Sequence, residues 1–375
     1  MKVLLAAGGT GGHIYPGITI AQTLLERIPD AEILFVGAKG GLEAELVPRA
    51  GFAFEAIPAR YLRRRLSAEA LLTAWTAWRG FREAWRIVGR FRPDVAVGTG
   101  GYVSGPVVLA AALRRVPTVI QEQNAYPGLT SRLLAKAARR IALGSEAAAR
   151  YFPRTGKVVV TGNPIRRDIL VRTRAEAIAS LGLDAARKTV LVFGGSQGGR
   201  SINNAVVEAA PALLARGDVQ IVHQTGKIHF ADVAARAGAA PRPAGDGASA
   251  GHWHIVPFIH DMPAAYAAAD LVVCRAGAIT LAEIAARGLP AVLVPYPFAA
   301  ERHQDANAAE LARAGAAVVV PDAELTGPAL AQTVSGLLDD EERRTRMAAA
   351  ARRLGRPDAA GRIAELVLAA AGRGR

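Results

Sequence analysis

A chain of 375 residues is long enough for two domains with separate hydrophobic cores. Its 51% hydrophobic and 21% charged residues are typical of a globular protein, and no apolar run approaches the roughly 20 residues of a membrane-spanning helix. Cys274 is the only cysteine, which excludes an internal disulfide and favours a reducing cytosol; its apolar neighbours predict a core position. The net charge of +14 indicates a polyanionic partner (nucleic acid, acidic lipid or a phosphorylated small molecule), unless it reflects composition alone.

Short β-branched runs alternate with helical stretches along the whole chain, which predicts parallel sheets covered by helices. In the first half, strands are expected near residues 3–7, 32–36, 94–98, 118–121, 141–143 and 158–161. After Asn163-Pro164 the pattern restarts, with strands near residues 189–193, 219–223, 254–257, 271–274, 291–294 and 317–320. The stretch 234–251 is rich in Ala, Gly and Pro and predicts a loop or a frayed helix end. Two doubly wound domains that face each other across a cleft are the simplest interpretation.

Three glycine-rich turns, at residues 8–12, 98–101 and 194–199, each follow a predicted strand and precede a helix. Glycine lets the backbone approach an anion closely, and the following helix directs N–H groups at it. Any one of these turns could be merely a tight turn, but three together indicate several phosphates. None matches G-x-G-x-x-G or G-x-x-x-x-G-K-[ST], so a dinucleotide-dependent oxidoreductase and a P-loop ATPase are both disfavoured.

Few side chains are candidates for chemistry. His13 opens a helix, where the positive end of the dipole favours a neutral ring that can accept a proton, although a simple turn histidine is the commoner case. Glu283 lies one to two turns into the helix that follows the strand at 271–274, where its carboxylate could accept hydrogen bonds from a ribose diol, or could simply lie on the surface. No cluster with metal-ligand spacing occurs, so we expect no metal and no cofactor, and Asp322-Ala323-Glu324 is expected to be a solvated turn.

A basic segment with aromatic residues lies between Arg60 and Arg92. It carries nine arginines against Glu69 and Glu83. Within it, one helical stripe contains Trp78, Phe81, Trp85 and Val88, and the adjoining stripe contains Arg79, Arg82, Arg86 and Arg90. The pattern alone favours aromatic residues in the core and arginines in solvent; docking of the stripe on an anionic membrane, together with residues 63–65, is the alternative.

The order of the motifs resembles one family over essentially the whole chain. The residues that carry the resemblance are Gly8-Gly9-Thr10-Gly11-Gly12-His13, Gly98-Thr99-Gly100-Gly101-Tyr102-Val103-Ser104-Gly105-Pro106, Gln121-Glu122-Gln123-Asn124, Gly162-Asn163-Pro164-Ile165-Arg166, Gly194-Gly195-Ser196-Gln197-Gly198 and Arg275-Ala276-Gly277-Ala278. Together they are similar to the MurG family of bacterial cell-wall transferases, which add N-acetylglucosamine (GlcNAc) from UDP-GlcNAc to lipid I and so form lipid II.

The resemblance implies the GT-B fold, which is two Rossmann-like domains with parallel sheets facing across a cleft. Residues 1–164 would form the acceptor and membrane-side domain, to which a final helix in 357–375 returns, and residues 165–356 would bind the donor. The enzyme would be peripheral, at the cytoplasmic face of the inner membrane. Its partners would be UDP-GlcNAc, lipid I and an anionic membrane surface, with no nucleic acid.

The resemblance also assigns roles to individual residues. Ser196 would bind the donor phosphates, Ile259 the uracil, and residues 278–283 the phosphate and ribose, while His303 or Gln304 would read the GlcNAc hydroxyls. The donor-site residues implied are Thr10, Gly11, Gly12, Asn124, Arg166, Ser196, Ile259, Ala278, Ile279, Thr280, Leu281, Ala282, Glu283, His303 and Gln304. The acceptor diphosphate would meet Gly12, His13, Gly100, Gly101 and Tyr102.

The implied chemistry is displacement at the anomeric carbon with inversion. His13 would be the catalytic base that accepts the proton of the acceptor C4 hydroxyl, or a ligand of the acceptor diphosphate. An enzyme of the UDP-GlcNAc 2-epimerase type, with the same fold, is the alternative. A nucleic-acid-binding protein would explain the +14 charge but would leave the glycine turns without a role.

Overall fold

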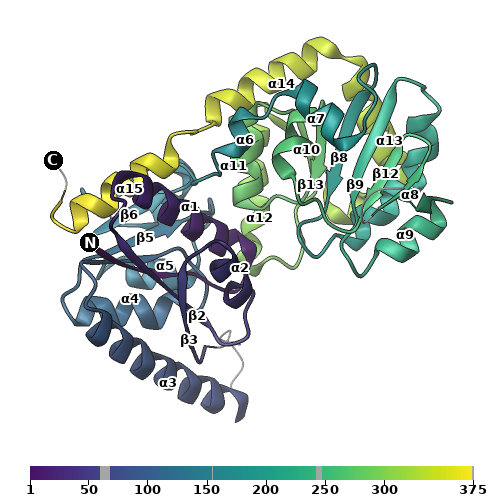
Figure 1. Cartoon of the computed structure of the whole chain (residues 1–375). Helices are drawn as coiled ribbons and strands as arrows, with labels where there is room; N and C mark the ends of the chain where they lie inside the picture. The colour runs from purple at the N-terminus through teal and green to yellow at the C-terminus, as the bar shows by residue number, and fades with distance from the viewer. Residues whose placement is uncertain (60–67, 154, 242–246, 374–375) are drawn as a thin grey trace. The chain divides into compact units, whose positions relative to one another are not determined.

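The computed structural model describes residues 1–59, 68–153, 155–241 and 247–373 and separates into two compact units (Figure 1). The first comprises Met1–Ile165 with Asp358–Arg375, and the second comprises Arg166–Pro357. In the part of the chain that the structure describes, no helix combines the length and the apolar character needed to cross a bilayer.

The first unit is built on a seven-stranded, entirely parallel sheet with the order β3-β2-β1-β4-β5-β6-β7. The strands are β1 Lys2–Ala6, β2 Glu32–Ala38, β3 Ala53–Ile57, β4 Val95–Gly98, β5 Thr118–Glu122, β6 Arg140–Leu143 and β7 Val158–Val160. The helices are α1 Gly11–Arg27, α2 Glu43–Arg49, α3 Ala68–Phe91, α4 Ser104–Leu113, α5 Leu129–Leu134, the 3₁₀ turn η1 Glu146–Tyr151 and the C-terminal α15 Ala359–Ala370. The strand order reverses between β1 and β4, which makes this pair the switch point of the sheet.

The second unit has an eight-stranded sheet with the order β10-β11-β12-β9-β8-β13-β14-β15. The strands are β8 Lys188–Phe193, β9 Val219–Gln224, β10 Ala240–Pro241, β11 Ala248–Ala250, β12 Trp253–Val256, β13 Leu271–Cys274, β14 Ala291–Leu293 and β15 Ala317–Val319. The helices are α6 Asp168–Val171, α7 Arg174–Leu181, α8 Arg200–Leu214, α9 Phe230–Arg236, α10 Met262–Ala268, α11 Ala278–Arg287, α12 His303–Arg313, α13 Gly327–Asp339 and α14 Glu341–Leu354, with 3₁₀ turns η2 Ala300–Arg302 and η3 Asp322–Glu324. Here the order reverses between β8 and β13.

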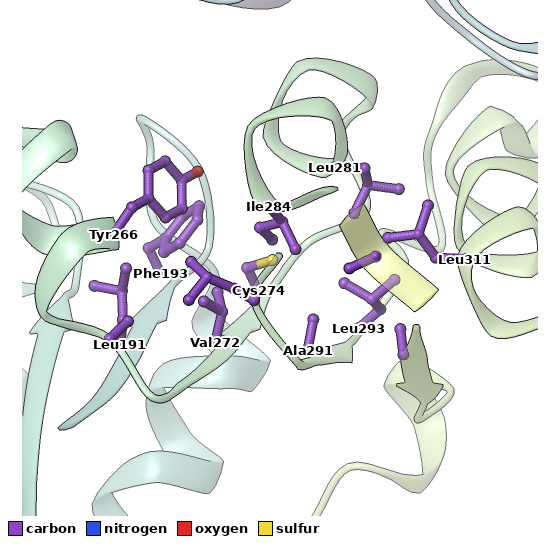
Figure 2. Close-up of a cluster of buried hydrophobic side chains, with 14 of the residues drawn as sticks. Leu191, Phe193, Tyr266, Val272, Cys274, Leu281, Ile284, Ala291, Leu293 and Leu311 are labelled. Carbon is purple, nitrogen blue, oxygen red and sulfur yellow. The ribbon is translucent and has the colours of Figure 1, made fainter. Parts of the chain in front are cut away.

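Both sheets are buried on two faces, which explains why their strands are continuous apolar runs. In β1, Val3 and Leu5 belong to one core cluster and Leu4 and Ala6 to the cluster on the opposite face. In the second unit, the cluster in Figure 2 joins strands β8, β13 and β14 to α10, α11 and α12 and includes Cys274. Cys274 is fully buried in this cluster, which confirms its expected core role, and this burial raises the pKa of its thiol.

Two regions differ from the sequence prediction. Strand β3, Ala53–Ile57, was not predicted because the segment contains one β-branched residue and forms only the edge of the sheet. The stretch 234–251 was expected to be a loop or a frayed helix end; α9 does end within it at Arg236, but β10 and β11 also lie there and extend the sheet with antiparallel pairs. Edge strands this short carry little periodicity for a sequence pattern to reveal.

Helix α3 divides its aromatic stripe between core and solvent. Phe81 and Trp85 pack partly buried against a core cluster, and Val88 is buried within it. One turn earlier, Trp78 is 47% exposed and stacks on Trp75, which is 56% exposed. The core interpretation is therefore right for the C-terminal half of the stripe, and only its beginning is open to solvent; residues 63–65 lie outside the described residues.

The C-terminal helix α15 packs into the core of the first unit, and a mutation in this helix tests how much it stabilises that unit. Ile363 on α15 is fully buried against the cluster that contains α1 and β1. We expect Ile363→Ala to lower the free energy of unfolding of this unit by about 2–5 kcal/mol, because the mutation leaves a cavity. Urea denaturation measures the loss, with Glu365→Ala, on the exposed side of the same helix, as a control that costs less than about 1 kcal/mol. An equal effect of both substitutions would contradict this role of α15.

Candidate active site

Two glycine turns meet at the switch point of the first sheet. The first follows β1 and the second follows β4, and two glycines of the second turn have positive φ, +96° at Gly100 and +78° at Gly101. A Cβ on Gly101 would collide with the carbonyl oxygen of Gly8, so the two turns contact each other backbone to backbone. Only glycine permits this approach, and it leaves the N-terminus of α1 beside the second turn.

His13 lies in the first turn of α1, directly against the second glycine turn. A Cβ on Gly100 would stand 2.7 Å from the His13 Nδ1 atom. Nδ1 is 3.1 Å from the Oε1 atom of Gln123, and the Thr99 hydroxyl donates to the His13 carbonyl oxygen at 2.8 Å. The imidazole is therefore held by Gln123, which follows β5, while Thr99, which follows β4, holds the backbone of the same residue.

Thr10, Gly11 and Gly12 form the start of the same helix. Thr10 is the N-cap in an extended conformation, and Gly11 and Gly12 are the first helical residues. The first N–H groups of a helix and its dipole stabilise an anion at this position. Of the residues expected at the acceptor diphosphate, the structure thus brings Gly12, His13, Gly100 and Gly101 together.

Tyr102 completes that group and adds a carboxylate that the sequence analysis did not find. Its ring lies against Gly9, and burial together with the charge of Glu43 raises the pKa of its phenol. Glu43 is fully buried and accepts hydrogen bonds from the backbone N–H of Ala38 at 2.7 Å and of Gly9 at 3.3 Å. This side chain ties the first glycine turn to the loop after β2.

Asn124 follows β5 at the same edge of the sheet. Its backbone N–H and its side-chain amide both donate to Oε1 of Glu122, at 3.0 and 3.2 Å, and the backbone of Gly128 donates to Oε2 at 3.3 Å. Glu122 is buried, so its carboxylate fixes this loop.

At the switch point of the second sheet, the third glycine turn follows β8. Ser196 is exposed at its tip, and Gly198 has a positive φ of +79° where a Cβ would collide with the carbonyl oxygen of Thr225. Gln224, at the end of β9, donates to the carbonyl oxygen of Gly195 at 2.9 Å and accepts from the backbone N–H of Ile259 at 2.8 Å. The Gln224 amide therefore connects the glycine turn expected at the donor phosphates to Ile259, the residue expected at the uracil.

Beside Ile259 the second unit has a pocket of about 130 Å³. The lining is mostly apolar and consists of Leu181, Leu183, Val222, His254, Val256, Phe258, Ile259, His260 and Asp261. The loop after β12, which contains Phe258, Ile259 and His260, thus lines a small and mostly apolar pocket.

Residues 278–283 form the first half of α11, which starts directly after β13 at the switch point. Glu283 is not a surface residue: it is partly buried, and its Oε2 accepts a hydrogen bond from the Tyr266 hydroxyl at 3.0 Å. Figure 2 shows Tyr266 beside Phe193, with its hydroxyl oxygen at the edge of the apolar cluster. Burial raises the pKa of Glu283 to about 7, against the opposing effects of the Arg166 charge and the Tyr266 hydrogen bond.

His303 and Gln304 start α12 with complementary hydrogen-bonding atoms. Oε1 of Gln304 accepts from the backbone N–H of Ala276 at 3.1 Å and of Tyr296 at 2.9 Å, so its amide nitrogen is the end that can donate to a ligand. The Nδ1 atom of His303 lies 2.7 Å from the carbonyl oxygen of Ala300, which can only accept. Nδ1 therefore carries the proton, and in the neutral ring Nε2 is an acceptor.

Asp322 is not solvated, contrary to the sequence expectation. Its carboxylate accepts from the Arg275 guanidinium at 2.5 Å and from the Ser201 hydroxyl at 2.6 Å. Arg275 also donates to the carbonyl oxygens of Val294 and Pro295, at 3.2 and 3.3 Å. The pair thus fastens the loop that leads to α12, and no sequence pattern indicates it because its partners lie far apart along the chain.

Glu43, Gln123, Gln224, Tyr266 and Arg275 are the functional candidates that the sequence analysis did not single out for a role. Four of them lie at or just after the carboxyl end of a strand or in the segment that follows, where polar residues interrupt an apolar run. That interruption was the available signal. Tyr266 offered none, since an aromatic residue in an apolar helix is normally core.

Comparison with known proteins identifies the family. Residues 3–143 match the glycosyltransferase family 28 N-terminal domain, and residues 189–363 match the glycosyltransferase family 28 C-terminal domain. The UDP-N-acetylglucosamine–N-acetylmuramyl-(pentapeptide) pyrophosphoryl-undecaprenol N-acetylglucosamine transferase of Moorella thermoacetica is 47% identical over 369 residues, which cover 98% of each chain.

Solved structures agree with this match. The crystal structure of Acinetobacter baumannii MurG has a TM-score of 0.75 and 30% identity and covers 98% of this chain and 99% of its own. The UDP-GlcNAc 2-epimerase of Neisseria meningitidis has a TM-score of 0.68, with 98% of this chain and 100% of its own covered, but only 14% identity, so it shares the fold alone. The chain belongs to glycosyltransferase family 28 and, within that family, to the MurG group.

Proposed function

We propose that this protein transfers GlcNAc from UDP-GlcNAc to the C4 hydroxyl of the N-acetylmuramoyl-pentapeptide of lipid I and so forms lipid II for peptidoglycan. The observation that carries the proposal is full-length identity of 42–47% to relatives that bear the name of this transferase. The epimerase alternative is not favoured, since its support is a shared fold at 14% identity.

In this proposal the second unit binds the donor. Ser196 and the N-terminus of α11 stabilise the diphosphate, and the loop at Ile259 with its pocket holds the uracil. Ala278, Ile279, Thr280, Leu281 and Ala282 line the path from phosphate to ribose, and we assign Thr10, Gly11, Gly12, Asn124 and Arg166 to the donor as well.

Glu283 reads the ribose, because an ionised carboxylate accepts two hydrogen bonds from a diol. The sugar meets Gln304 and His303 together: the amide nitrogen of Gln304 donates to one hydroxyl, and the Nε2 atom of a neutral His303 accepts from another. This division assigns each of the two residues its own hydroxyl.

The acceptor diphosphate meets Gly12, Gly100, Gly101 and Tyr102 in the first unit, and His13 accepts the proton of the attacking hydroxyl. The acceptor oxygen forms a bond to the anomeric carbon as the bond to the UDP phosphate oxygen breaks, so the configuration inverts. The electron pair leaves with UDP, whose charge is stabilised by Ser196 and by helix N-termini.

The docking surface for an anionic membrane begins with the exposed part of α3. Trp75 and Trp78 are exposed, and the Arg82 guanidinium lies 4.8 Å from the centre of the Trp78 ring. Exposed leucines are also present on the helices packed beside it, Leu109 and Leu113 on α4 and Leu129 and Leu133 on α5. Aromatic rings flanked by arginines suit the headgroup region, and an acceptor with a polyprenyl tail stays in the bilayer. We therefore infer a peripheral enzyme at the inner face of the cell membrane that does not act on nucleic acid.

The first test combines activity with His13. The purified protein should release UDP from UDP-GlcNAc only when a lipid-linked muramoyl acceptor is added. An epimerase would instead convert UDP-GlcNAc with no acceptor present. His13→Ala should lower turnover by about 10²–10⁴-fold, because the general base is lost. Titration calorimetry should show unchanged UDP-GlcNAc binding in this variant; near wild-type turnover with intact binding would remove His13 from the chemistry.

The pKa of Glu283 predicts how donor binding depends on pH. The carboxylate that accepts from the ribose must be ionised, and in the free protein it becomes protonated as the pH falls below about 7. The Kd of UDP-GlcNAc should therefore rise about tenfold per pH unit below this value and stay constant above it. Glu283→Gln should bind more weakly at pH 8 and lose the dependence. A Glu283→Gln protein that keeps the wild-type pH profile would place the titrating group elsewhere.

Charge reversal tests the membrane surface. We expect Arg79→Glu, Arg82→Glu and Arg86→Glu together to weaken binding to anionic vesicles by about a hundredfold and to reduce its salt dependence, since each arginine contributes about 1 kcal/mol. The matched control makes the same charge change on the second unit with Arg343→Glu, Arg353→Glu and Arg356→Glu, all exposed. Equal loss in both triple mutants would mean that net charge, and not this surface, determines binding.

A further inference from the structure

Three buried amide side chains form a continuous chain that ends at His13. The Nε2 group of Gln121 donates to Oδ1 of Asn163 at 3.0 Å, the Nε2 group of Gln123 donates to Oε1 of Gln121, and Oε1 of Gln123 lies 3.1 Å from Nδ1 of His13. Asn163, Gln121 and Gln123 are only 6%, 0% and 3% exposed. Buried amides without a structural or functional task are rare, because each must recover the hydrogen bonds that it loses to water.

The direction of the chain is fixed by groups that can only accept. Nε2 of Gln123 lies 2.7 Å from the carbonyl oxygen of Thr99, so the amide end that faces this oxygen must be the NH₂ group. Turning the amide over would set two oxygens against each other in a buried site. Asn163 is oriented in the same way, since its Nδ2 donates to the carbonyl oxygen of Gln123 at 3.0 Å.

The orientation of the amide chain determines which ring nitrogen of His13 carries the proton. Because Oε1 of Gln123 can only accept, the Nδ1 atom that faces it must carry a proton, and in the neutral ring the lone pair then lies on Nε2. The room for this contact comes from Gly100, where a Cβ would stand 2.7 Å from Nδ1 and 3.3 Å from Oε1 of Gln123.

We propose that Gln123, oriented through Gln121 and Asn163, is a positioning residue that holds His13 in the Nδ1–H tautomer and so directs its Nε2 lone pair at the acceptor hydroxyl. The proposal rests on the role of His13 as base given above, and it decides between the two roles open to this histidine. A neutral His13 in this tautomer accepts a proton at Nε2 but cannot donate from Nε2 to a diphosphate.

The tautomer can be measured without turnover. In protein labelled with ¹⁵N-histidine at pH 8, long-range ¹H–¹⁵N spectra should show His13 with a protonated Nδ1 and an unprotonated Nε2, and His13→Gln identifies its signals among the seven histidines. Gln123→Met, which keeps the length of the side chain but removes the acceptor, should give a mixture of tautomers. A wild-type His13 protonated at Nε2, or a Gln123→Met protein with unchanged signals, would overturn the proposal.

Kinetics give the second readout. Gln123→Met should lower kcat by about 10- to 100-fold with little change in the KM for UDP-GlcNAc, because only the base is misplaced. Gln121→Met should have a smaller effect in the same direction, and the double mutant should be no worse than Gln123→Met, since both act through one contact. If Gln123→Met does not fold, Gln121→Met provides both readouts, and wild-type behaviour of that variant in both would overturn the chain.

The matched control is Gln220→Met in the second unit. Gln220 is likewise fully buried on a strand and makes hydrogen bonds to Asp184 and Thr189, so its loss costs stability without approaching His13. It should leave the His13 signals and kcat unchanged. If His13→Ala keeps its turnover while the spectra show the stated tautomers, the amide chain does set the tautomer of His13, but His13 is not the catalytic base.

Discussion

Backbone contact between glycine turns is the constraint on which both candidate sites depend. At Gly101 the chain passes against the carbonyl oxygen of Gly8, and at Gly198 it passes against that of Thr225, each at a positive φ. Any Cβ at these positions would push apart the turns that follow neighbouring strands. With the turns in contact, helix N-termini and polar side chains gather at the point where each sheet reverses its strand order.

Around these contacts, the two units use the same principle with different side chains. In the first unit a buried carboxylate, Glu43, binds the backbone of the glycine turn, and amides hold His13. In the second unit, Gln224 binds the turn, and the Arg275–Asp322 pair binds the loop that leads to Gln304. In each case a buried polar side chain makes hydrogen bonds to backbone groups at or after the ends of strands, where the sheet ladder no longer pairs them.

The fold could be predicted largely from the sequence because parallel strands buried on both faces are apolar runs, and glycine turns mark where several of these strands end. The sheet edges could not: β3, β10 and β11 are short or partly polar, and their pairing depends on neighbours distant in sequence. The candidate site residues His13 and Glu283 could be picked out because each lies in a helix that follows a strand and a glycine-containing turn. Their supporting residues could not, since Gln123, Tyr266 and Asp322 acquire their partners only when strands far apart in the chain become adjacent. The stripe on α3 shows a further limit of prediction from sequence. Helical periodicity cannot tell which part of a stripe is packed and which part is exposed along a single helix.

The return of α15 to the first unit has a consequence for how the protein is made. A ribosome releases residues 1–165 long before Ile363, Ala364 and Val367, the fully buried side chains that close one face of the first sheet. The second unit, Arg166–Pro357, is continuous and can complete its core as it emerges. The usual order, in which the N-terminal domain folds first during translation, is therefore reversed in its final step: the first unit waits with an apolar face exposed until the last helix is synthesised. A chain that stops before Ile363 would therefore carry a second unit with all of its own residues beside a first unit whose core is incomplete.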